Sequence, residues 1–203
     1  MAENGLPLAT AISEADPYHG TGTRYVHNPS MEQSASNPTG AVVAPISTAT
    51  TFIQSTPGAA SAKDDPNSFG KGFEYSRTGN PTRGAFERAV AAAEKCRHCV
   101  AFSSGSAATS AVIHLLSPGE RIMCIDDVYG GTQRYLRRIV RPRMGIGIDF
   151  VNFHDAESVK AALKPGKTKL MWLETPTNPT LRVTDIQMVA NLAHENGCWL
   201  AVD

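Results

Sequence analysis

The stretch Arg121-Ile-Met-Cys-Ile-Asp126 is a short apolar run that ends in a carboxylate, which is the pattern of a buried strand. Three further runs of this kind follow it, at residues 148–153, 169–174 and 198–203. Segments of helical spacing separate the runs: 132–140, which Pro142 ends, 155–163, which Asp155 caps, and 184–197, where Thr184 and Gln187 form a capping box and Gly197 ends the helix. This alternation predicts an α/β fold with a mostly parallel sheet and helical crossovers.

The same alternation begins further upstream. Asn80 and Pro81 are a good helix start, as N-cap and first helical residue, and apolar residues recur at helical spacing up to Ala93. Residues 99–102 are a short apolar run that predicts a buried strand. Residues 103–106 then form a predicted turn, and residues 107–116 a predicted helix.

The composition excludes several classes of protein. The 203 residues carry 19 basic and 19 acidic side chains, and 41% of them are hydrophobic. This balance argues against disorder over the whole chain and against a general nucleic-acid-binding protein. No apolar run approaches the roughly 18 residues of a membrane span, and the first residues lack the features of a secretory signal. We therefore expect a cytoplasmic protein without a membrane partner, whose four cysteines are reduced thiols.

The charge is unevenly distributed along the chain. Residues 71–147 hold 12 basic and 6 acidic side chains, whereas the flanking segments are net acidic. Such a basic segment is either a solvated surface or an attraction for an anionic ligand, for which phosphate is the obvious candidate. Composition alone favours the solvated surface.

Residues 1–72 do not look like a packed core. Pro, Ser, Thr, Gly and Asn dominate residues 28–40 and 55–72, and neither stretch shows a helical or strand period. The segment is predicted to be an N-terminal arm, partly disordered, that packs on a neighbouring subunit. Residues 73–203 then form the folded domain.

Polar and aromatic side chains follow the predicted strands. They occupy residues 103–106, residues 126–129, residues 174–178 and Asp203. In parallel sheets, ligands bind beyond the carboxyl ends of the strands. Hydroxyls, carboxylates, an amide and an aromatic ring at one edge exceed what packing requires, and we predict a ligand site there.

Each candidate in this site also has a purely structural interpretation. The turn Ser103-Ser-Gly-Ser106 suits a phosphate, although it matches neither the dinucleotide nor the P-loop pattern. A buried Asp203 needs a cationic or hydrogen-bonding partner, such as a protonated ring nitrogen, unless it caps a helix. Tyr129, before Gly130 and Gly131, suits stacking on a flat ring, or else is a core tyrosine.

The pair Cys96 and Cys99 has the C-x-x-C spacing of a redox or metal site. A redox motif follows a strand and opens a helix, whereas this pair closes a predicted helix and enters a predicted strand. The six histidines are scattered along the chain. We predict no metal site.

Four motifs taken together carry a family resemblance. They are Phe73-Glu-Tyr-Ser-Arg-Thr-Gly-Asn-Pro-Thr82, Ser103-Ser-Gly-Ser-Ala-Ala-Thr109, Asp126-Asp-Val-Tyr-Gly-Gly-Thr132 and Glu174-Thr-Pro-Thr-Asn-Pro179. In this order they resemble the Cys/Met-metabolism family of pyridoxal-phosphate (PLP) enzymes, which has the aspartate-aminotransferase fold, PLP fold type I. The resemblance runs from about residue 40 to residue 203.

The resemblance implies a role for each matching residue. Gly105 and Ser106 resemble backbone donors to the cofactor phosphate, and Tyr75 and Arg77 the pair that reaches the phosphate of the neighbouring subunit. The other implied roles are ring stacking and proton transfer for Tyr129, contact with the phenolic oxygen for Asn178, support for Glu174, and pairing with the pyridine nitrogen for Asp203. Arginine suits phosphate because its planar fork binds two oxygens at once.

The implied reaction is γ-elimination of cystathionine to cysteine, 2-oxobutanoate and ammonia, a step of transsulfuration, with hydrogen sulfide as a side product. Residues 129–135 are most similar to γ-lyases and next to γ-synthases, while Gly131 argues against a methionine γ-lyase. A β-lyase stays open within the family, and a non-catalytic scaffold outside it. The family assembles as homo-oligomers, and a tetramer built as a dimer of dimers is expected.

The sequence departs from the family pattern at its end. The family's Schiff-base lysine follows the aspartate strand, and none of the lysines at 160, 164, 167 and 169 stands in a matching context. The resemblance therefore implies that residues 73–203 are the first half of the PLP-binding domain. The rest of that domain and a C-terminal domain are not part of this sequence.

Overall fold

The computed structural model describes residues 45–53 and 73–203. Within them, a four-stranded sheet has the order β2-β1-β3-β4, with every pair of neighbours parallel. The strands are β1 (Arg121–Ile125), β2 (Gly147–Val151), β3 (Thr168–Leu173) and β4 (Trp199–Val202). The predicted α/β fold with a mostly parallel sheet is thus confirmed.

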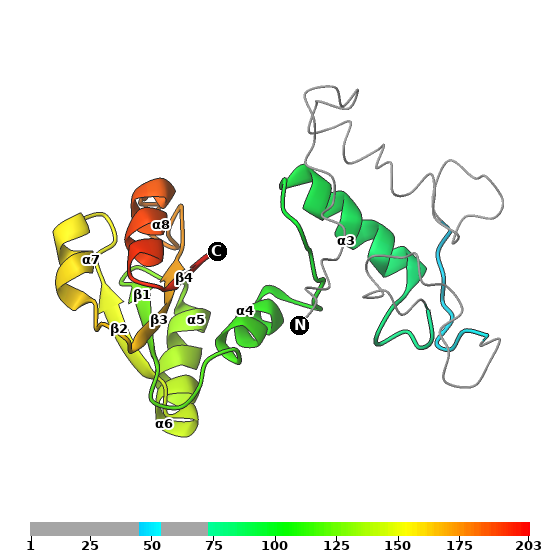
Figure 1. Ribbon diagram of the computed structural model, residues 1–203, viewed down its shortest axis with the longest axis horizontal. Helices are drawn as coiled ribbons and strands as arrows, with labels where there is room; N and C mark the ends of the chain where they lie inside the picture. The colour runs from blue at the N-terminus through cyan, green and yellow to red at the C-terminus, as the bar shows by residue number, and fades with distance from the viewer. Residues whose placement is uncertain (1–44, 54–72) are drawn as a thin grey trace, which may run out of the picture. The chain divides into compact units, whose positions relative to one another are not determined.

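Two helices precede the first strand, and helical segments connect the strands that follow (Figure 1). They are α3 (Pro81–Ala93), α4 (Gly105–Ile113), α5 (Gly130–Tyr135), the π-helical segment η2 (Leu136–Val140), α6 (Arg141–Met144), α7 (Ala156–Ala162) and α8 (Ile186–Glu195). The chain divides into two units, Met1–Ala101 and Phe102–Asp203, and the sheet belongs to the second.

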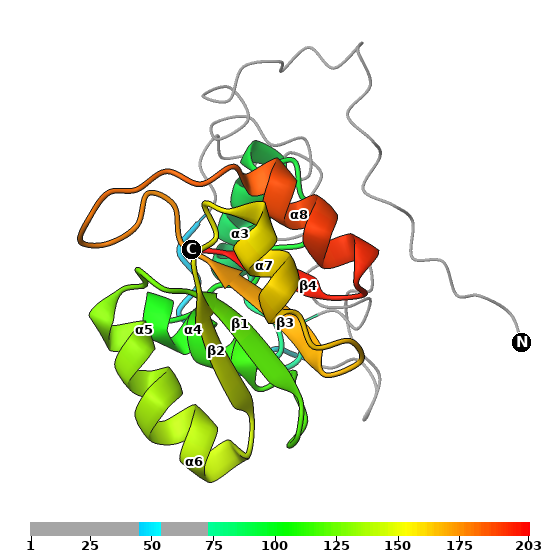
Figure 2. The same ribbon diagram turned by 90° about the vertical axis from the view of Figure 1, so that its left-hand side faces the viewer.

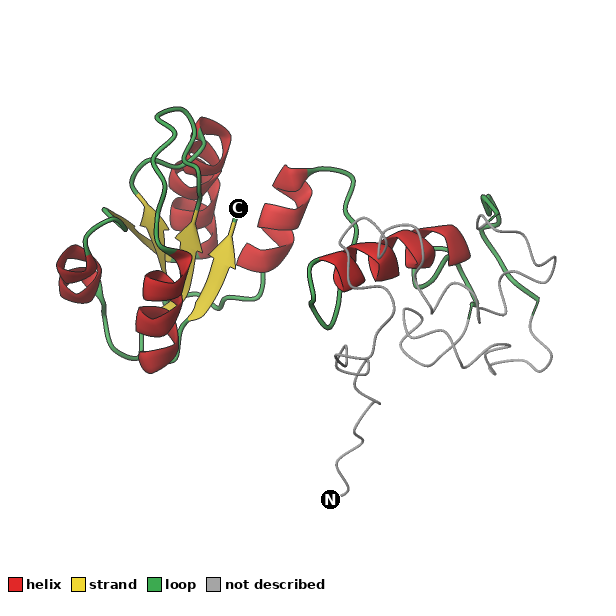
Figure 3. Ribbon diagram, turned by 90° about the horizontal axis from the view of Figure 1, so that it is seen from above, coloured by secondary structure: helices red, strands yellow, loops and turns green. Residues whose placement is uncertain are grey.

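The strand order fixes the face on which each crossover lies. The chain moves from β1 to β2 in one direction along the sheet, and from β2 to β3 and on to β4 in the other. Right-handed crossovers therefore place α5, η2 and α6 on one face and α7 and α8 on the other. Figure 2 shows α7 and α8 beside each other over the sheet, and Figure 3 shows the yellow strands between helices.

The core follows from the central position of β1. Residues 122–125 of this strand are all buried, because strands lie on both sides of it and helices cover both faces. Phe153, on the β2–α7 connection, and Val159, on α7, are fully buried in the same hydrophobic core. Burying an apolar side chain of this size stabilises the fold by about 1.5–3 kcal/mol.

Several predicted helix ends are confirmed. The Asn80 side chain accepts the N–H groups of Thr82 and Arg83, with Pro81 as the first residue of α3. The Asp155 side chain caps α7 in the same way. Gly197 follows α8 with φ +64°, a conformation that glycine adopts without strain.

The strand predicted at residues 99–102 is wrong. Val100 and Phe102 are 60% and 48% exposed, and no strand of the described residues pairs with this segment. The Ala101 N–H is instead taken up by the Glu87 carboxylate, at 2.9 Å. An apolar run becomes a strand only where a neighbour supplies the ladder of hydrogen bonds, and none of the four strands does so here.

The prediction that Pro142 ends its helix is also wrong. The chain passes from α5 into η2 and continues through α6 as far as Met144. Because the π segment interrupts the i→i−4 ladder, Pro142 lies in the first turn of a new α segment, where no N–H donor is required.

Two other predicted helix starts are displaced. The N-cap of α8 is Asp185, whose side chain accepts the Met188 N–H at 3.1 Å, so the Thr184–Gln187 capping box is wrong. Gln187 donates to Asn191 instead. Helix α4 begins at Gly105, two residues earlier than predicted, because Ser104 caps it.

In the first unit, residues 45–53 lie beside the turn that precedes α3. Thr51 and Tyr75 form an antiparallel bridge, and the rings of Phe52 and Phe73 are 5.4 Å apart. The predictions for residues 1–44 and 54–72 of the arm lie outside the described residues. None of the described helices has both the length and the apolar character that a bilayer crossing requires.

Candidate functional site

An open cavity of 390 Å³ lies beyond the carboxyl ends of β1, β3 and β4. Its lining consists of Tyr129, Glu174, Pro176, Asn178 and Asp203. The structure therefore brings together four of the residues singled out from the sequence, from three separate stretches of chain. The volume is in the range of small-molecule sites.

Glu174 holds two sides of this cavity together. Its side chain is buried, and its two carboxylate oxygens accept the backbone N–H groups of Tyr129, at 2.8 Å, and Asn178, at 2.6 Å. A buried carboxylate must be paired, and here both oxygens are. Because both of its oxygens accept backbone N–H groups, Glu174 positions Tyr129 and Asn178 and has no free oxygen to offer a ligand.

Three residues of the cavity lining carry side-chain polar groups without a partner in the described part of the chain. These groups are the Tyr129 hydroxyl, the Asn178 side-chain amide and the Asp203 carboxylate, all on exposed residues. Together they offer an acceptor charge, an amide and an aromatic ring to a flat, polar ligand.

The burial expected for Asp203 is wrong. Asp203 is exposed, at the end of a strand whose Trp199 and Val202 side chains are also exposed. Strand β4 has one strand neighbour in the described residues, β3. The Asp203 N–H donates to the Leu173 carbonyl at the end of β3, at 2.8 Å. Its carboxylate therefore lies at the rim of the cavity.

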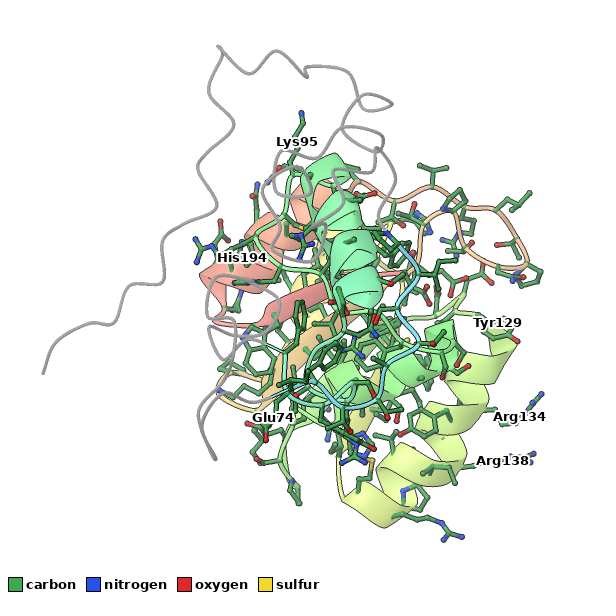
Figure 4. The ribbon with its side chains drawn as sticks, turned by 90° about the vertical axis from the view of Figure 1, so that its right-hand side faces the viewer. Glu74, Lys95, Tyr129, Arg134, Arg138 and His194 are labelled. Atoms are coloured by element: carbon green, nitrogen blue, oxygen red, sulfur yellow. The ribbon has the colours of Figure 1, made fainter. Side chains whose placement is uncertain are left out.

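Tyr129 stands immediately before α5, and Gly131 makes room for its ring. A Cβ atom added at Gly131 would lie 2.4 Å from Cε1 of Tyr129, whereas one added at Gly130 would meet nothing within 4 Å. Only the second glycine of the pair is thus required for this ring position. Figure 4 shows the side chains of Tyr129, Arg134 and Arg138 extending away from the ribbon.

A second carboxylate joins the same two loops, and sequence reasoning missed its role. Asp127 accepts hydrogen bonds from the Thr177 and Thr180 hydroxyls. These bonds, that of Thr177 above all, hold the pKa of the Asp127 carboxyl below its usual value. Next to it, Arg182 forms an ion pair with Asp126 at 3.5 Å. The only signal in the sequence was the presence of Thr177 and Thr180 among the three threonines of Thr175-Pro-Thr-Asn-Pro-Thr180.

Gly105 and Ser106 lie at the N-terminus of α4, where Ser104 accepts the Ala107 N–H at 3.1 Å. This is the location expected of phosphate donors. Neither residue is part of the cavity lining, so the structure does not bring them to the other site residues. Their role toward a phosphate stays a prediction.

Tyr75 and Arg77 belong to the first unit. The Arg77 guanidinium lies over the Tyr75 ring, 5.2 Å from its centroid, and both side chains are exposed. The two residues thus form one cation–π pair that presents a charge and a hydroxyl outward. Their predicted reach to a neighbouring subunit stays a prediction.

Cys124 lies within β1, and its thiol is buried. Burial raises the pKa of this thiol far above its usual value, and the Glu174 carboxylate raises it further. The thiol is therefore held protonated and is not a nucleophile.

Comparisons with known proteins agree with this geometry. The family model described as Cys/Met metabolism PLP-dependent enzyme matches residues 22–203. Cystathionine gamma-lyase of Rattus norvegicus is 46% identical over 175 residues, which are 86% of this chain and 40% of that protein. A probable cystathionine gamma-synthase of Herpetosiphon aurantiacus is 40% identical over 185 residues, 91% of this chain and 53% of that protein.

The fold has a close match among solved structures. Cystathionine gamma-lyase from Lactobacillus plantarum, complexed with L-serine, superposes with a TM-score of 0.79 at 38% identity, over 91% of this chain and 44% of that one. This likeness confirms the fold type implied by the resemblance. The chain spans about half or less of the length of the relatives it matches.

Proposed function

Since the chain belongs to the family of Cys/Met-metabolism PLP-dependent enzymes, we propose that it forms the first half of the cofactor-binding domain of a carbon–sulfur lyase. The proposed reaction is γ-elimination of cystathionine. The observation that carries the proposal is the meeting of Asp203, Asn178 and Tyr129 around one cavity, each with an unpartnered polar group.

These residues fit pyridoxal phosphate. The Asp203 carboxylate suits a protonated ring nitrogen, the Tyr129 ring suits stacking on a flat heterocycle, and the Asn178 amide suits a phenolic oxygen. When bound, the cofactor supplies an electron sink for negative charge on the carbon next to the substrate amine.

Each residue then has a definite task. The Asp203 carboxylate would hold a proton on the ring nitrogen of the cofactor, since the pair of opposite charges favours the protonated form. Acting as a phenolate, the Tyr129 oxygen would take a proton from the substrate ammonium and become a neutral hydroxyl, so that the substrate amine becomes a nucleophile. Glu174 keeps Tyr129 and Asn178 at a fixed separation through their backbone N–H groups.

A γ-synthase is the second candidate, because the relatives include both γ-lyases and a probable γ-synthase at similar identity. Products separate the two: a lyase releases 2-oxobutanoate from cystathionine alone, whereas a synthase needs an activated homoserine and cysteine. Hydrogen sulfide release, a tetramer built as a dimer of dimers and a cytoplasmic location belong to the same proposal.

The test uses the full-length protein and Asp203→Asn. We expect this variant to fold and to bind cofactor, but to lose about a hundredfold or more in turnover, the scale of one lost electrostatic contact. Release of 2-oxobutanoate and cysteine from cystathionine measures the turnover, and visible absorbance measures cofactor content.

Asp155→Asn is the matched control, since asparagine caps a helix as well as aspartate and this position lies outside the cavity. Turnover of Asp203→Asn within twofold of wild type would remove Asp203 from the site. A full-length protein without bound cofactor and without turnover would leave the scaffold interpretation.

A further inference from the structure

Two loops flank the cavity, and side chains join them in both directions. The β1 loop, residues 126–129, carries Tyr129 at its end, and the β3 loop, residues 174–182, carries Asn178. Glu174 reaches from the β3 loop to the Tyr129 backbone, while Asp127 reaches from the β1 loop to Thr177. Each loop thus contributes one carboxylate that accepts a hydrogen bond from the other loop.

Thr177 is the centre of the second connection. Its side chain is fully buried, and its hydroxyl donates to Oδ2 of Asp127 at 2.5 Å and accepts the Arg182 N–H at 2.9 Å. Its backbone N–H donates to the Arg182 carbonyl at 3.0 Å, and its carbonyl accepts the Leu181 N–H at 2.8 Å. Every polar group of this residue is therefore engaged.

The position of Thr177 in the chain links its contact with Asp127 to the cavity. Thr177 lies between Pro176 and Asn178, and both of these residues line the cavity. The Asn178 N–H is itself held by Glu174 at 2.6 Å. A shift of Thr177 away from Asp127 would therefore carry Asn178 with it and weaken the contact on which the spacing to Tyr129 depends.

We propose that Asp127 is a positioning residue, which through the Thr177 hydroxyl fixes the distance between Asn178 and Tyr129 across the cavity. It does not touch the ligand. The ligand's identity, pyridoxal phosphate, rests on the proposed function, whereas the coupling of the two loops rests on the contacts of Asp127 and Thr177 alone.

The experiment compares isosteric variants in the full-length protein. Thr177→Val removes the hydroxyl and keeps the volume, Asp127→Asn turns a donor toward the hydroxyls, and Thr177→Ser restores the hydrogen bond. We measure the Kd for pyridoxal phosphate of the apoenzyme, kcat and KM, and the exchange rates of the Asn178 and Tyr129 amide protons.

We expect Thr177→Val and Asp127→Asn each to raise the Kd about tenfold, the scale of one hydrogen bond to a charged group. The double variant should bind no more weakly than Asp127→Asn alone, because each substitution removes the Asp127–Thr177 contact, while Asp127→Asn also changes the contact with Thr180. Thr177→Ser should stay within about twofold of wild type. Amide exchange at Tyr129 should rise in both weakened variants, although neither changes Tyr129 itself.

A purely structural role would give a different result. If both variants lower the unfolding midpoint but leave the Kd and the Tyr129 exchange at wild-type values, or if their effects on the Kd add, the proposal is overturned. Should the wild-type protein bind no cofactor, the proposed function fails, and amide exchange at Tyr129 in the two variants still decides the coupling.

Discussion

Tyr129 combines a ring that can stack with a hydroxyl that can carry a proton, and the two tasks are separable. We expect Tyr129→Phe in the full-length protein to keep cofactor affinity, because the ring supplies most of the contact energy. Turnover should fall about 10²–10⁴-fold, the scale of a positioned proton-transfer group. Cofactor titration and steady-state kinetics measure the two quantities. Normal turnover in the Phe variant would reduce Tyr129 to a packing residue.

Gly131 controls where that ring lies. In Gly131→Ala the new Cβ would overlap the Tyr129 ring, which must move. We expect turnover to fall, while the free energy of unfolding stays equal or rises by up to about 1 kcal/mol, since alanine favours helix over glycine. Gly130→Ala is the matched control, because its Cβ meets no atom within 4 Å. Equal turnover in the two variants would contradict this role for Gly131.

The sequence indicated which residues surround the cavity, but not how they are held. Tyr129, Glu174, Asn178 and Asp203 follow predicted strands, and the topology of a parallel sheet brings such positions together. The contact between Asp127 and Thr177 was not predictable, because it joins residues 50 positions apart whose pairing depends on loop conformation.

Among the elements, β1 and β2 are tied by an ion pair near their amino-terminal ends. Arg121 donates two hydrogen bonds of 2.7 Å to Asp149, and Lys164 adds a third at 3.0 Å. The Arg121 hydrogen bonds hold the pKa of the Asp149 carboxyl below its usual value. The folded state thus binds this proton less readily than the unfolded state does.

The sign of the pH effect follows from this depressed pKa. The contribution of Asp149 is complete above its unfolded pKa of about 3.9 and is lost as pH falls through the folded value. We expect Asp149→Asn to lower the free energy of unfolding by about 1–2 kcal/mol at pH 7 and by less near pH 3. Urea unfolding at both pH values measures this difference. The exposed Glu157→Gln serves as control, and an equal loss at both pH values would contradict the argument.

The elements were predictable where local and long-range requirements agree. Residues 122–125 are apolar, β-branched in part, and flanked by strands on both sides, so the pattern and the structure coincide. Residues 99–102 show the same kind of pattern without a neighbour in the described residues, and they do not form a strand. At Pro142, the π segment η2 removed the requirement for a donor that the prediction assumed.

For the whole molecule, the cation–π pair of Tyr75 and Arg77 is predicted to reach the cofactor phosphate of a neighbouring subunit. We expect Arg77→Ala in the full-length protein to retain cofactor more weakly by about 1.5–3 kcal/mol, as charged hydrogen bonds to the phosphate are lost. Dialysis followed by absorbance measures cofactor content. Arg138→Ala is the control, since Figure 4 shows this side chain extending away from the ribbon.

Mixed oligomers test whether Arg77 acts on a neighbouring subunit. In a mixture of Arg77→Ala and Asp203→Asn chains, a site that takes Asp203 from one chain and Arg77 from the other is intact. Activity above that of either variant alone is therefore expected. If the mixture shows no gain in activity, Arg77 and Asp203 of one chain contribute to the same site.

The hydrogen bonds from the main-chain amides of Tyr129 and Asn178 to Glu174 have a consequence for how this cavity can change during evolution. Main-chain N–H groups are the same for every residue except proline, so substitutions at positions 129 and 178 leave this attachment intact. The backbone support of these two positions is thus inherited whichever side chains stand there.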